Sequence, residues 1–212
     1  MATLPPSAFE RYDEEPDGLF YDVPRFVTHI DDRAVSAVTH LYREYFPAGG
    51  DILDLMSSWV SHFPPEVAYR RVVGLGMNAD ELAYNPCLNE YLVQDLNTHP
   101  RLPFDDGTFD GVAICVSIQY LTRPVEVLRE TARVLKNGSS LVVTFSNRCF
   151  PTKAVALWQS LDDPGHLQLV TRYLRETNAF TEIESLDRSV RRWGNDPLYA
   201  VVGRSSWQPV SC

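Results

Sequence analysis

Between residues 50 and 204, short apolar runs alternate with amphipathic segments, a pattern that predicts strands and helices in turn. The run 109–116 is apolar, partly β-branched and bounded by turn residues, which is typical of a strand buried on both faces of a sheet. Residues 124–136 carry apolar side chains at helical spacing, and the Asn-Gly pair at 137–138 favours the end of a helix there. A second apolar run follows at 141–145, so this segment predicts a strand–helix–strand unit with parallel strands.

The same criteria predict elements along the rest of the chain. The runs expected to form the other strands are 51–56, 72–76, 91–97, 180–186 and 198–203. The segments expected to form the other helices are 31–46, a helix beginning at 79, a helix ending near 161, and one over 167–178 after a break at 162–165. Strands that alternate with helices in this way predict a single α/β domain over residues 31–212.

The first 30 residues have a different character. Prolines and acidic turns argue against regular structure, yet the aromatic content is too high for a disordered tail. The aromatic residues of this segment are Phe9, Tyr12, Phe20, Tyr21 and Phe26. Two roles are open for the segment: a strap that packs on the helices, or a lid over a ligand cleft.

Composition narrows the class of protein. The 212 residues are 44% hydrophobic, which is enough for one domain with a substantial core. The formal charge of −9 argues against non-specific binding to nucleic acid. No apolar run approaches the roughly 20 residues of a membrane span, and no signal peptide is visible, so we expect a cytoplasmic protein without membrane contacts. The four cysteines lack metal-ligand spacing, so we expect reduced thiols and no metal site.

Four sequence motifs carry a family resemblance. They are Leu102-Pro103-Phe104, Phe109-Asp110, Tyr120-Leu121 followed by Pro124, and the run from Arg129-Glu130 to Asn137-Gly138. With them the chain resembles the class I S-adenosylmethionine-dependent methyltransferases, in particular their small-molecule "type 11" branch, over roughly residues 50–204. The resemblance implies a Rossmann-like three-layer α/β/α sandwich with a mostly parallel seven-stranded sheet whose last strand is antiparallel. It also implies S-adenosyl-L-methionine as cofactor and a small molecule as methyl acceptor.

The resemblance assigns cofactor positions at the end of the first predicted strand, where the chain departs from the family pattern. Asp54 matches the acidic residue of the family, but Met56, Ser58 and Val60 stand where three glycines are usual. Glycine permits close approach and unusual backbone angles, so the loop must take another path or the ligand must sit differently. Ser57 and Ser58 still offer hydroxyl and backbone N–H groups to a carboxylate.

Further cofactor positions follow from the resemblance at the next strand ends. Gly76 stands where the family has an acid that holds both ribose hydroxyls. Asn78 is a candidate ribose contact, with a helix N-cap as its alternative role. Asp95 and Leu96 match the adenine-binding element, although a loop carboxylate such as Asp95 also commonly caps a turn. Val116 ends the fourth strand beside the expected cofactor.

Methyl transfer from a sulfonium is an in-line displacement that needs alignment, exclusion of water and sometimes a base. The candidate bases are His29, Tyr120 and Tyr21, and Tyr120 has the alternative role of a packed aromatic whose hydroxyl bonds to backbone. Phe26, Asn147 and Arg148 are candidates for acceptor binding. We therefore expect a small-molecule methyltransferase, monomeric or homodimeric. The alternative is a protein of the same fold that binds a nucleoside, another ligand or a partner without transferring methyl.

Overall fold

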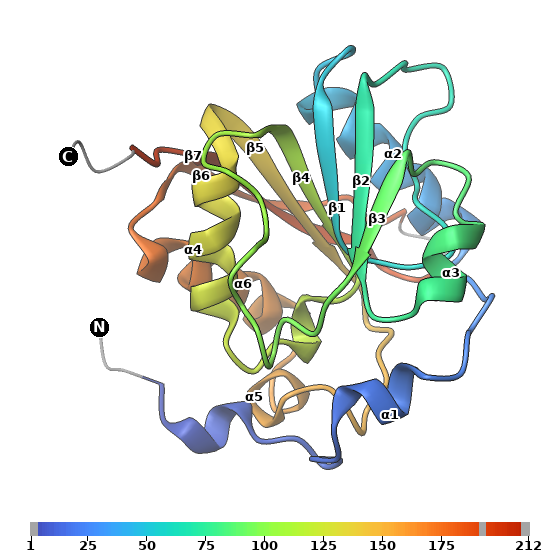
Figure 1. Cartoon of the computed structure of the whole chain (residues 1–212). Coiled ribbons are helices and arrows are strands. Elements are labelled where there is room, and N and C mark those ends of the chain that lie inside the picture. Colours follow the sequence, from blue (N-terminus) through green and yellow to red (C-terminus); the bar gives the residue numbers. More distant parts are fainter. Residues whose placement is uncertain (1–3, 191–193, 209–212) are drawn as a thin grey trace.

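The computed structural model describes residues 4–190 and 194–208, and its centre is one seven-stranded sheet (Figure 1). The strand order is β3-β2-β1-β4-β5-β7-β6, parallel except that β7 runs antiparallel to both of its neighbours. The strands are β1 (Asp51–Ser57), β2 (Arg71–Gly76), β3 (Glu90–Val93), β4 (Phe109–Cys115), β5 (Leu135–Phe145), β6 (Phe180–Asp187) and β7 (Tyr199–Ser205). The predicted Rossmann-like fold is confirmed.

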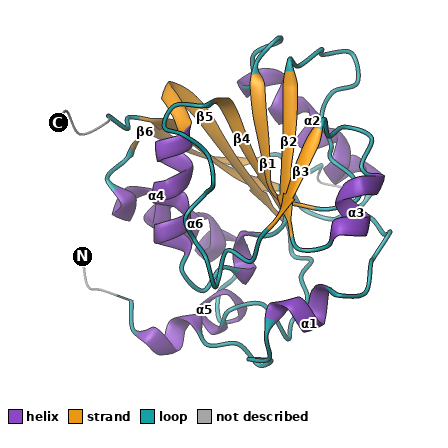
Figure 2. Cartoon of the chain, viewed as in Figure 1, coloured by secondary structure: helices purple, strands orange, loops and turns teal. Residues whose placement is uncertain are grey.

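Helices cover both faces of the sheet, as Figure 2 shows. The helices on its faces are α2 (Asp32–Tyr45), α3 (Ala79–Tyr84), α4 (Pro124–Val134) and α6 (Asp163–Thr177), whereas the short α5 (Ala156–Gln159) lies next to the N-terminal segment. The helices α4 and α6 pack on one face against β5 to β7, and α2 packs on the other against β4 and β5. The sheet is therefore buried on both sides, which explains why its central strands are almost continuously apolar.

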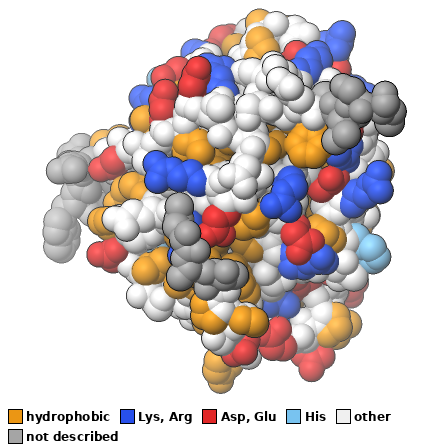
Figure 3. Space-filling view, turned by 90° about the vertical axis from the view of Figure 1, so that its left-hand side faces the viewer, with side chains coloured by type: hydrophobic (Ala, Val, Ile, Leu, Met, Phe, Trp, Pro, Cys, Tyr) orange, Lys and Arg blue, Asp and Glu red, His pale blue; other side chains and the backbone are white. Residues whose placement is uncertain are grey.

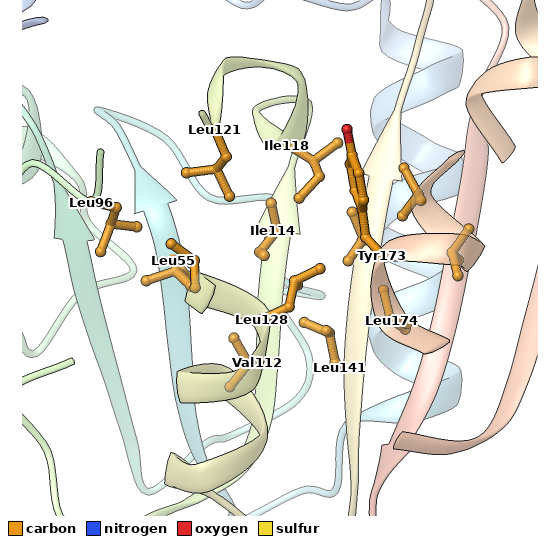
Figure 4. Packing of buried hydrophobic residues seen from close by; sticks show 14 of the residues in the cluster. Leu55, Leu96, Val112, Ile114, Ile118, Leu121, Leu128, Leu141, Tyr173 and Leu174 are labelled. Carbon is orange, nitrogen blue, oxygen red and sulfur yellow. The ribbon is translucent and has the colours of Figure 1, made fainter. Parts of the chain in front are cut away.

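The larger of the two cores lies between the sheet and the helices α4 and α6 (Figure 4). Leu55, Val112 and Ile114 from the central strands meet Leu128 of α4, and none of these four side chains is measurably exposed. Full burial of one such side chain contributes about 1.5–3 kcal/mol. Because β1 and β4 pair directly as parallel strands, their carboxyl ends lie side by side above this core.

Two helix boundaries differ from the predicted ones. The helix α4 ends at Val134 instead of continuing to Asn137-Gly138, because Leu135 already pairs with Phe109 as the first residue of β5. Gly138 has a φ of +80° and lies inside β5. The predicted break at 162–165 is instead the start of α6, where the Asp162 carboxylate accepts the Gly165 N–H as an N-cap.

The N-terminal segment, here residues 4–30, contains two short helices, η1 (Pro6–Phe9) and α1 (Asp17–Tyr21), where little regular structure was expected. In Figure 1 it runs in dark blue across the bottom of the view, past α5, below the end of the sheet. The Asp17 carboxylate accepts two hydrogen bonds from Arg11, at 2.7 and 2.8 Å, and lies 3.2 Å from Lys153 Nζ. The side chains of Arg11, Asp17 and Lys153 are only 8%, 6% and 1% exposed, so a buried ionic cluster anchors the segment.

The surface carries charges of both signs. On the face shown in Figure 3, Lys and Arg side chains lie among Asp and Glu side chains instead of forming one large patch of a single sign. None of the helices within residues 4–190 and 194–208 is both long enough and apolar enough to cross a membrane.

Candidate functional site

A cavity lies at the carboxyl ends of β1, β2 and β4, covered by the N-terminal segment. Eight of the nine predicted cofactor positions line it: Met56, Ser57, Ser58, Gly76, Asn78, Asp95, Leu96 and Val116. The ninth, Asp54, lines a smaller neighbouring cavity. The main cavity measures about 130 Å³, which is below the roughly 300 Å³ at the lower end of typical ligand pockets. A nucleoside therefore enters only if a covering group moves.

Two residues that line the cavity have left-handed backbone conformations without being glycine. Met56 has a φ of +60° and Val116 a φ of +49°. The left-handed region costs an L-residue roughly 1–2 kcal/mol, and it is rarest for β-branched residues such as valine. Met56 occupies the first of the three missing glycine positions. The loop thus adopts at Met56 the left-handed backbone conformation that glycine favours, although no glycine is present there.

Side-chain hydrogen bonds hold the rest of the loop after β1. Asp54 Oδ2 accepts hydrogen bonds from Ser57 at 2.6 Å and Ser61 at 2.5 Å. Asn85 donates to the Ser58 carbonyl at 2.8 Å and to the Ser61 hydroxyl at 2.9 Å. Burial raises the pKa of Asp54 to about 6, although both serine hydrogen bonds act in the opposite direction. Asp54 organises this loop from below the cavity.

Gly76 has a packing reason to lack a side chain. A Cβ at this position would lie 2.2 Å from the Ser57 carbonyl oxygen, because the ends of β1 and β2 pair closely there. A contact that short with backbone cannot be relieved by a side-chain rotation. No acid fits at the strand end in this arrangement.

Asn78 and Glu81 join the start of α3 to the N-terminal segment. Asn78 Oδ1 accepts the Glu81 N–H, which confirms the N-cap role, and its Nδ2 donates to the carbonyls of Tyr21 and Asp22. The Glu81 carboxylate accepts the Arg25 backbone N–H at 2.7 Å and the Ser58 hydroxyl at 2.6 Å. The same short helix start therefore holds both the cavity wall and its cover.

The β3 exit contributes Asp95 and Asn97. Asp95 accepts hydrogen bonds from the Asn97 N–H at 2.9 Å and the Thr98 hydroxyl at 2.6 Å, so it caps a turn as well as lining the cavity. Asn97 donates to Asp17 at 2.8 Å and to the Tyr120 carbonyl at 2.9 Å. Burial would raise the pKa of Asp17, but hydrogen bonds from Arg11 and Asn97 outweigh it and hold that pKa below its ordinary value.

The three candidate bases all line the cavity, but they differ in their hydrogen bonds and in how their pKa values are shifted. Tyr120 accepts the Phe150 N–H at 2.8 Å, the arrangement of a packed aromatic, and burial raises its pKa to about 12. Burial also raises the pKa of Tyr21 above its ordinary value. Desolvation beside the cavity lowers the pKa of His29, with Arg25 adding to the effect and Glu81 opposing it. At neutral pH His29 is therefore uncharged and able to accept a proton, whereas both tyrosines are protonated.

The three predicted acceptor contacts lie in different places. Phe26 is 49% exposed and stacks edge-on against Tyr84, and it does not line the main cavity. Asn147 is exposed. Arg148 lines a second, more open cavity of about 500 Å³, where its Nε donates to Asp196 at 2.7 Å. This second cavity shares His29, Val116, Tyr120 and Phe150 with the main one, so the two adjoin.

Sequence reasoning missed several residues that line the cavity or hold its cover. These are Asp17, Arg25, Glu81, Asn97 and Ser117. Asp17 begins the short helix α1 and Glu81 lies in the first turn of α3, and neither position marks a cavity residue in the sequence. Ser117 Oγ is buried without a hydrogen-bond partner among the described residues, so it is available to a bound ligand. Its place directly after a predicted buried strand was the available signal.

Residues 4–190 and 194–208 contain no group of three His, Cys, Asp or Glu side chains placed to hold a metal ion. Cys87, Cys115 and Cys149 are free thiols, and burial raises the pKa of Cys115 to about 11. Cys212 lies outside the described residues.

Comparison with known proteins points to one family. A family model described as "Methyltransferase domain" matches residues 60–143. The demethylmenaquinone methyltransferase of Mycobacterium bovis is 30% identical over 112 residues, which is 52% of this chain. The chain spans only about half of that relative's length, 46%.

Solved structures share the fold at low identity. The [4+2]-cyclase SpnF has a TM-score of 0.61 at 16% identity, over 89% of this chain and 91% of its own. Phosphoethanolamine N-methyltransferase 2 of Haemonchus contortus, solved in complex with S-adenosyl-L-methionine, has a TM-score of 0.57 at 14% identity, over 80% of this chain and 52% of its own. The recognition made from the sequence is therefore confirmed: over its central segment this chain resembles the class I S-adenosylmethionine-dependent methyltransferases, and its fold is theirs.

Proposed function

We propose that this protein binds S-adenosyl-L-methionine and transfers its methyl group to a small-molecule acceptor. The observation that carries the proposal is the convergence of eight predicted cofactor positions on one cavity at the carboxyl end of the sheet. Open α/β sheets bind nucleotides at that edge. The family match over 60–143 and the cofactor named for the H. contortus neighbour support the same assignment.

The donors and acceptors around the cavity suit such a ligand. Asp95 offers carboxylate lone pairs to an adenine amino group, and Leu75 and Leu121 supply apolar walls. Ser58 and the unpartnered Ser117 hydroxyl suit the polar amino-acid part of the cofactor. When bound, the cofactor supplies a methyl group activated by a sulfonium centre. The chain's own part is to bind, orient and exclude water.

His29 is the residue proposed to take a proton from the substrate that receives the methyl group. It lines both cavities and stacks edge-on against Phe150, with ring centroids 5.2 Å apart. Its lowered pKa keeps the imidazole neutral at physiological pH, which a general base requires. The acceptor would occupy the second cavity, where Arg148 suits an acidic group and Tyr120 and Phe150 suit a planar ring. The quinone-directed name of the M. bovis relative supports a small acceptor.

The N-terminal segment is proposed as a lid instead of a strap. Four of its residues, Asp17, Tyr21, Arg25 and His29, line the cavity. Its hydrogen bonds to Asn78 and Glu81 close the cavity, so its release would admit the ligand.

A thermal-shift titration with S-adenosylmethionine and S-adenosylhomocysteine up to several millimolar tests the proposal, followed by isotope transfer to candidate acceptors. At 100 times Kd, binding adds about 2.7 kcal/mol to the free energy of unfolding. This corresponds to a rise in Tm of roughly 5–10 °C for a domain of this size. A saturating rise with either ligand supports the proposal. The absence of any shift, together with no heat of binding by calorimetry, would overturn it in favour of a non-methylating protein of this fold. The cyclase name of SpnF is compatible with that alternative.

A further inference from the structure

The ribose of a nucleoside in this cavity lacks its expected partner at the end of β2. In open α/β sheets a carboxylate near that strand end accepts both ribose hydroxyls. Gly76 ends β2 here, and the Ser57 carbonyl oxygen excludes any side chain from its position. The partner must come from another element.

Glu81 brings a carboxylate to the same cavity from one helical turn beyond the strand end. The residue is 8% exposed and lines the cavity beside Ser58 and Gly76. Its two oxygens each accept one hydrogen bond, from Arg25 N and Ser58 Oγ. An ionised carboxylate has about four acceptor positions, so each oxygen retains capacity for one more donor.

The other two carboxylates that line the cavity are engaged more fully. Asp17 faces Arg11 and Lys153 and also accepts from Asn97. Asp95 caps the turn at Asn97 and Thr98. Glu81 forms no ion pair within residues 4–190 and 194–208, and its two partners are neutral donors. A buried carboxylate without a counter-charge gains most from additional hydrogen-bond donors.

We propose that Glu81 accepts the ribose hydroxyls of the bound nucleoside, in place of a carboxylate at the strand end. The inference rests on the proposed function, since it presupposes a nucleoside ligand. Because Glu81 also accepts the Arg25 N–H, the carboxylate that contacts the ligand also contacts the N-terminal segment.

The test combines a variant with a modified ligand. Calorimetry measures the affinity of wild type and Glu81→Gln for S-adenosylhomocysteine and for its 2′-deoxy analogue. Wild type should bind the 2′-deoxy analogue roughly 10- to 100-fold more weakly, the range for a hydrogen bond to a charged group. Glu81→Gln should lose a similar factor for S-adenosylhomocysteine and discriminate little between the two ligands. The matched control is Asp80→Asn, which removes an exposed carboxylate from the neighbouring position and should bind like wild type.

Each outcome decides the matter. Equal discrimination by wild type and Glu81→Gln, or undiminished binding by the variant, overturns the role of Glu81 and leaves the proposed function intact. No binding of either ligand by wild type overturns the proposed function itself. If Glu81→Gln does not fold by circular dichroism, Glu81→Asp takes its place, because it keeps the charge but withdraws it by one methylene. This variant should also lose the discrimination, and retained discrimination overturns the proposal.

Discussion

The loops on the two sides of the cavity are held in place by different kinds of contact. On the β1–β2 side, residues 54–61 and 76–81, side chains hold the loop. The buried Asp54 carboxylate accepts from Ser57, Asn85 at the end of α3 donates to the Ser58 carbonyl, and Glu81 accepts from the N-terminal segment. On the β3–β4 side, residues 94–98 and 116–121, local turns such as that capped by Asp95 occur together with long-range hydrogen bonds of Asn97. A loop that has lost its glycines is held by side chains, whereas a loop that keeps its usual residues is held by turn chemistry.

The N-terminal segment joins the two sides. Asn78 and Glu81 bind its carbonyl and N–H groups from one side, and Asn97 binds Asp17 from the other. Substitutions on each side should therefore differ in whether they change stability, ligand affinity or both.

The largest expected effect is the loss of stability caused by Asp17→Ala, in the N-terminal segment that joins the two sides. The change leaves the buried cations Arg11 and Lys153 without their shared carboxylate. Removing one partner of a buried ion pair typically costs about 3–5 kcal/mol. Urea unfolding measures the loss, and limited proteolysis should cut within residues 4–30 if the segment detaches. The control is Glu14→Ala, which removes a 61% exposed partner of Arg11 and should cost below about 1 kcal/mol. Equal effects of the two variants would contradict the buried cluster.

The next largest effect is a pH dependence on the β1–β2 side. Asp54 has a pKa of about 6 in the folded protein against an ordinary value of 3.8. Between these values the folded protein binds more protons than the unfolded chain, so the free energy of unfolding falls as the pH rises through this window. The expected loss is about 3 kcal/mol, present in wild type and absent in Asp54→Asn. Urea unfolding from pH 4 to 7.5 measures it.

A second carboxylate variant controls for the overall charge. Asp51 has a lowered pKa because Arg70 donates to it, so its contribution to stability is lost as the pH falls. Asp51→Asn should therefore change the pH profile in the opposite direction to Asp54→Asn. Parallel profiles for wild type and Asp54→Asn would show that the carboxyl ionises normally.

On the β3–β4 side the expected effect is on affinity. Asp95→Ala should weaken binding of S-adenosylmethionine by about 1.5–3 kcal/mol, because it removes a charged acceptor for the adenine amino group. Thr98→Val removes one turn hydrogen bond and keeps the carboxylate, so it should change affinity little. Calorimetry compares the two variants. Unchanged affinity in a folded Asp95→Ala protein would remove Asp95 from the site.

The fold could be predicted from the sequence more fully than the contacts around the cavity. The mostly parallel seven-stranded sheet and the helix α2, expected over residues 31–46, could be predicted from apolar periodicity, cap residues and the family motifs. The roles of Glu81 and Asp17 could not be predicted, because most of their partners are distant in the sequence and meet them only through the folded position of the N-terminal segment. Ser58 lies 23 residues from Glu81, and Asn97 lies 80 residues from Asp17. The end of α4 was misplaced because strand pairing by Leu135 overrode a strong local helix-stop signal.

The smallest expected effect tests the backbone of the β1–β2 side directly, at Met56. An L-residue in the left-handed conformation is strained by roughly 1–2 kcal/mol, whereas glycine is not. Both Met56→Gly and Met56→Ala lose the packing of the methionine side chain against the core. Only the glycine variant relieves the backbone, so Met56→Gly should be the more stable of the two by about 1 kcal/mol. At Met77, which also lines the cavity but has an ordinary φ, the order should reverse, with alanine more stable by about 0.5–1 kcal/mol. Urea unfolding of the four variants measures both differences. If the glycine variant is the more stable, or the less stable, at both positions, the backbone at Met56 is not strained in the way that its left-handed φ indicates. The hydrogen bonds to Asp54 would then alone determine the path of the loop after β1.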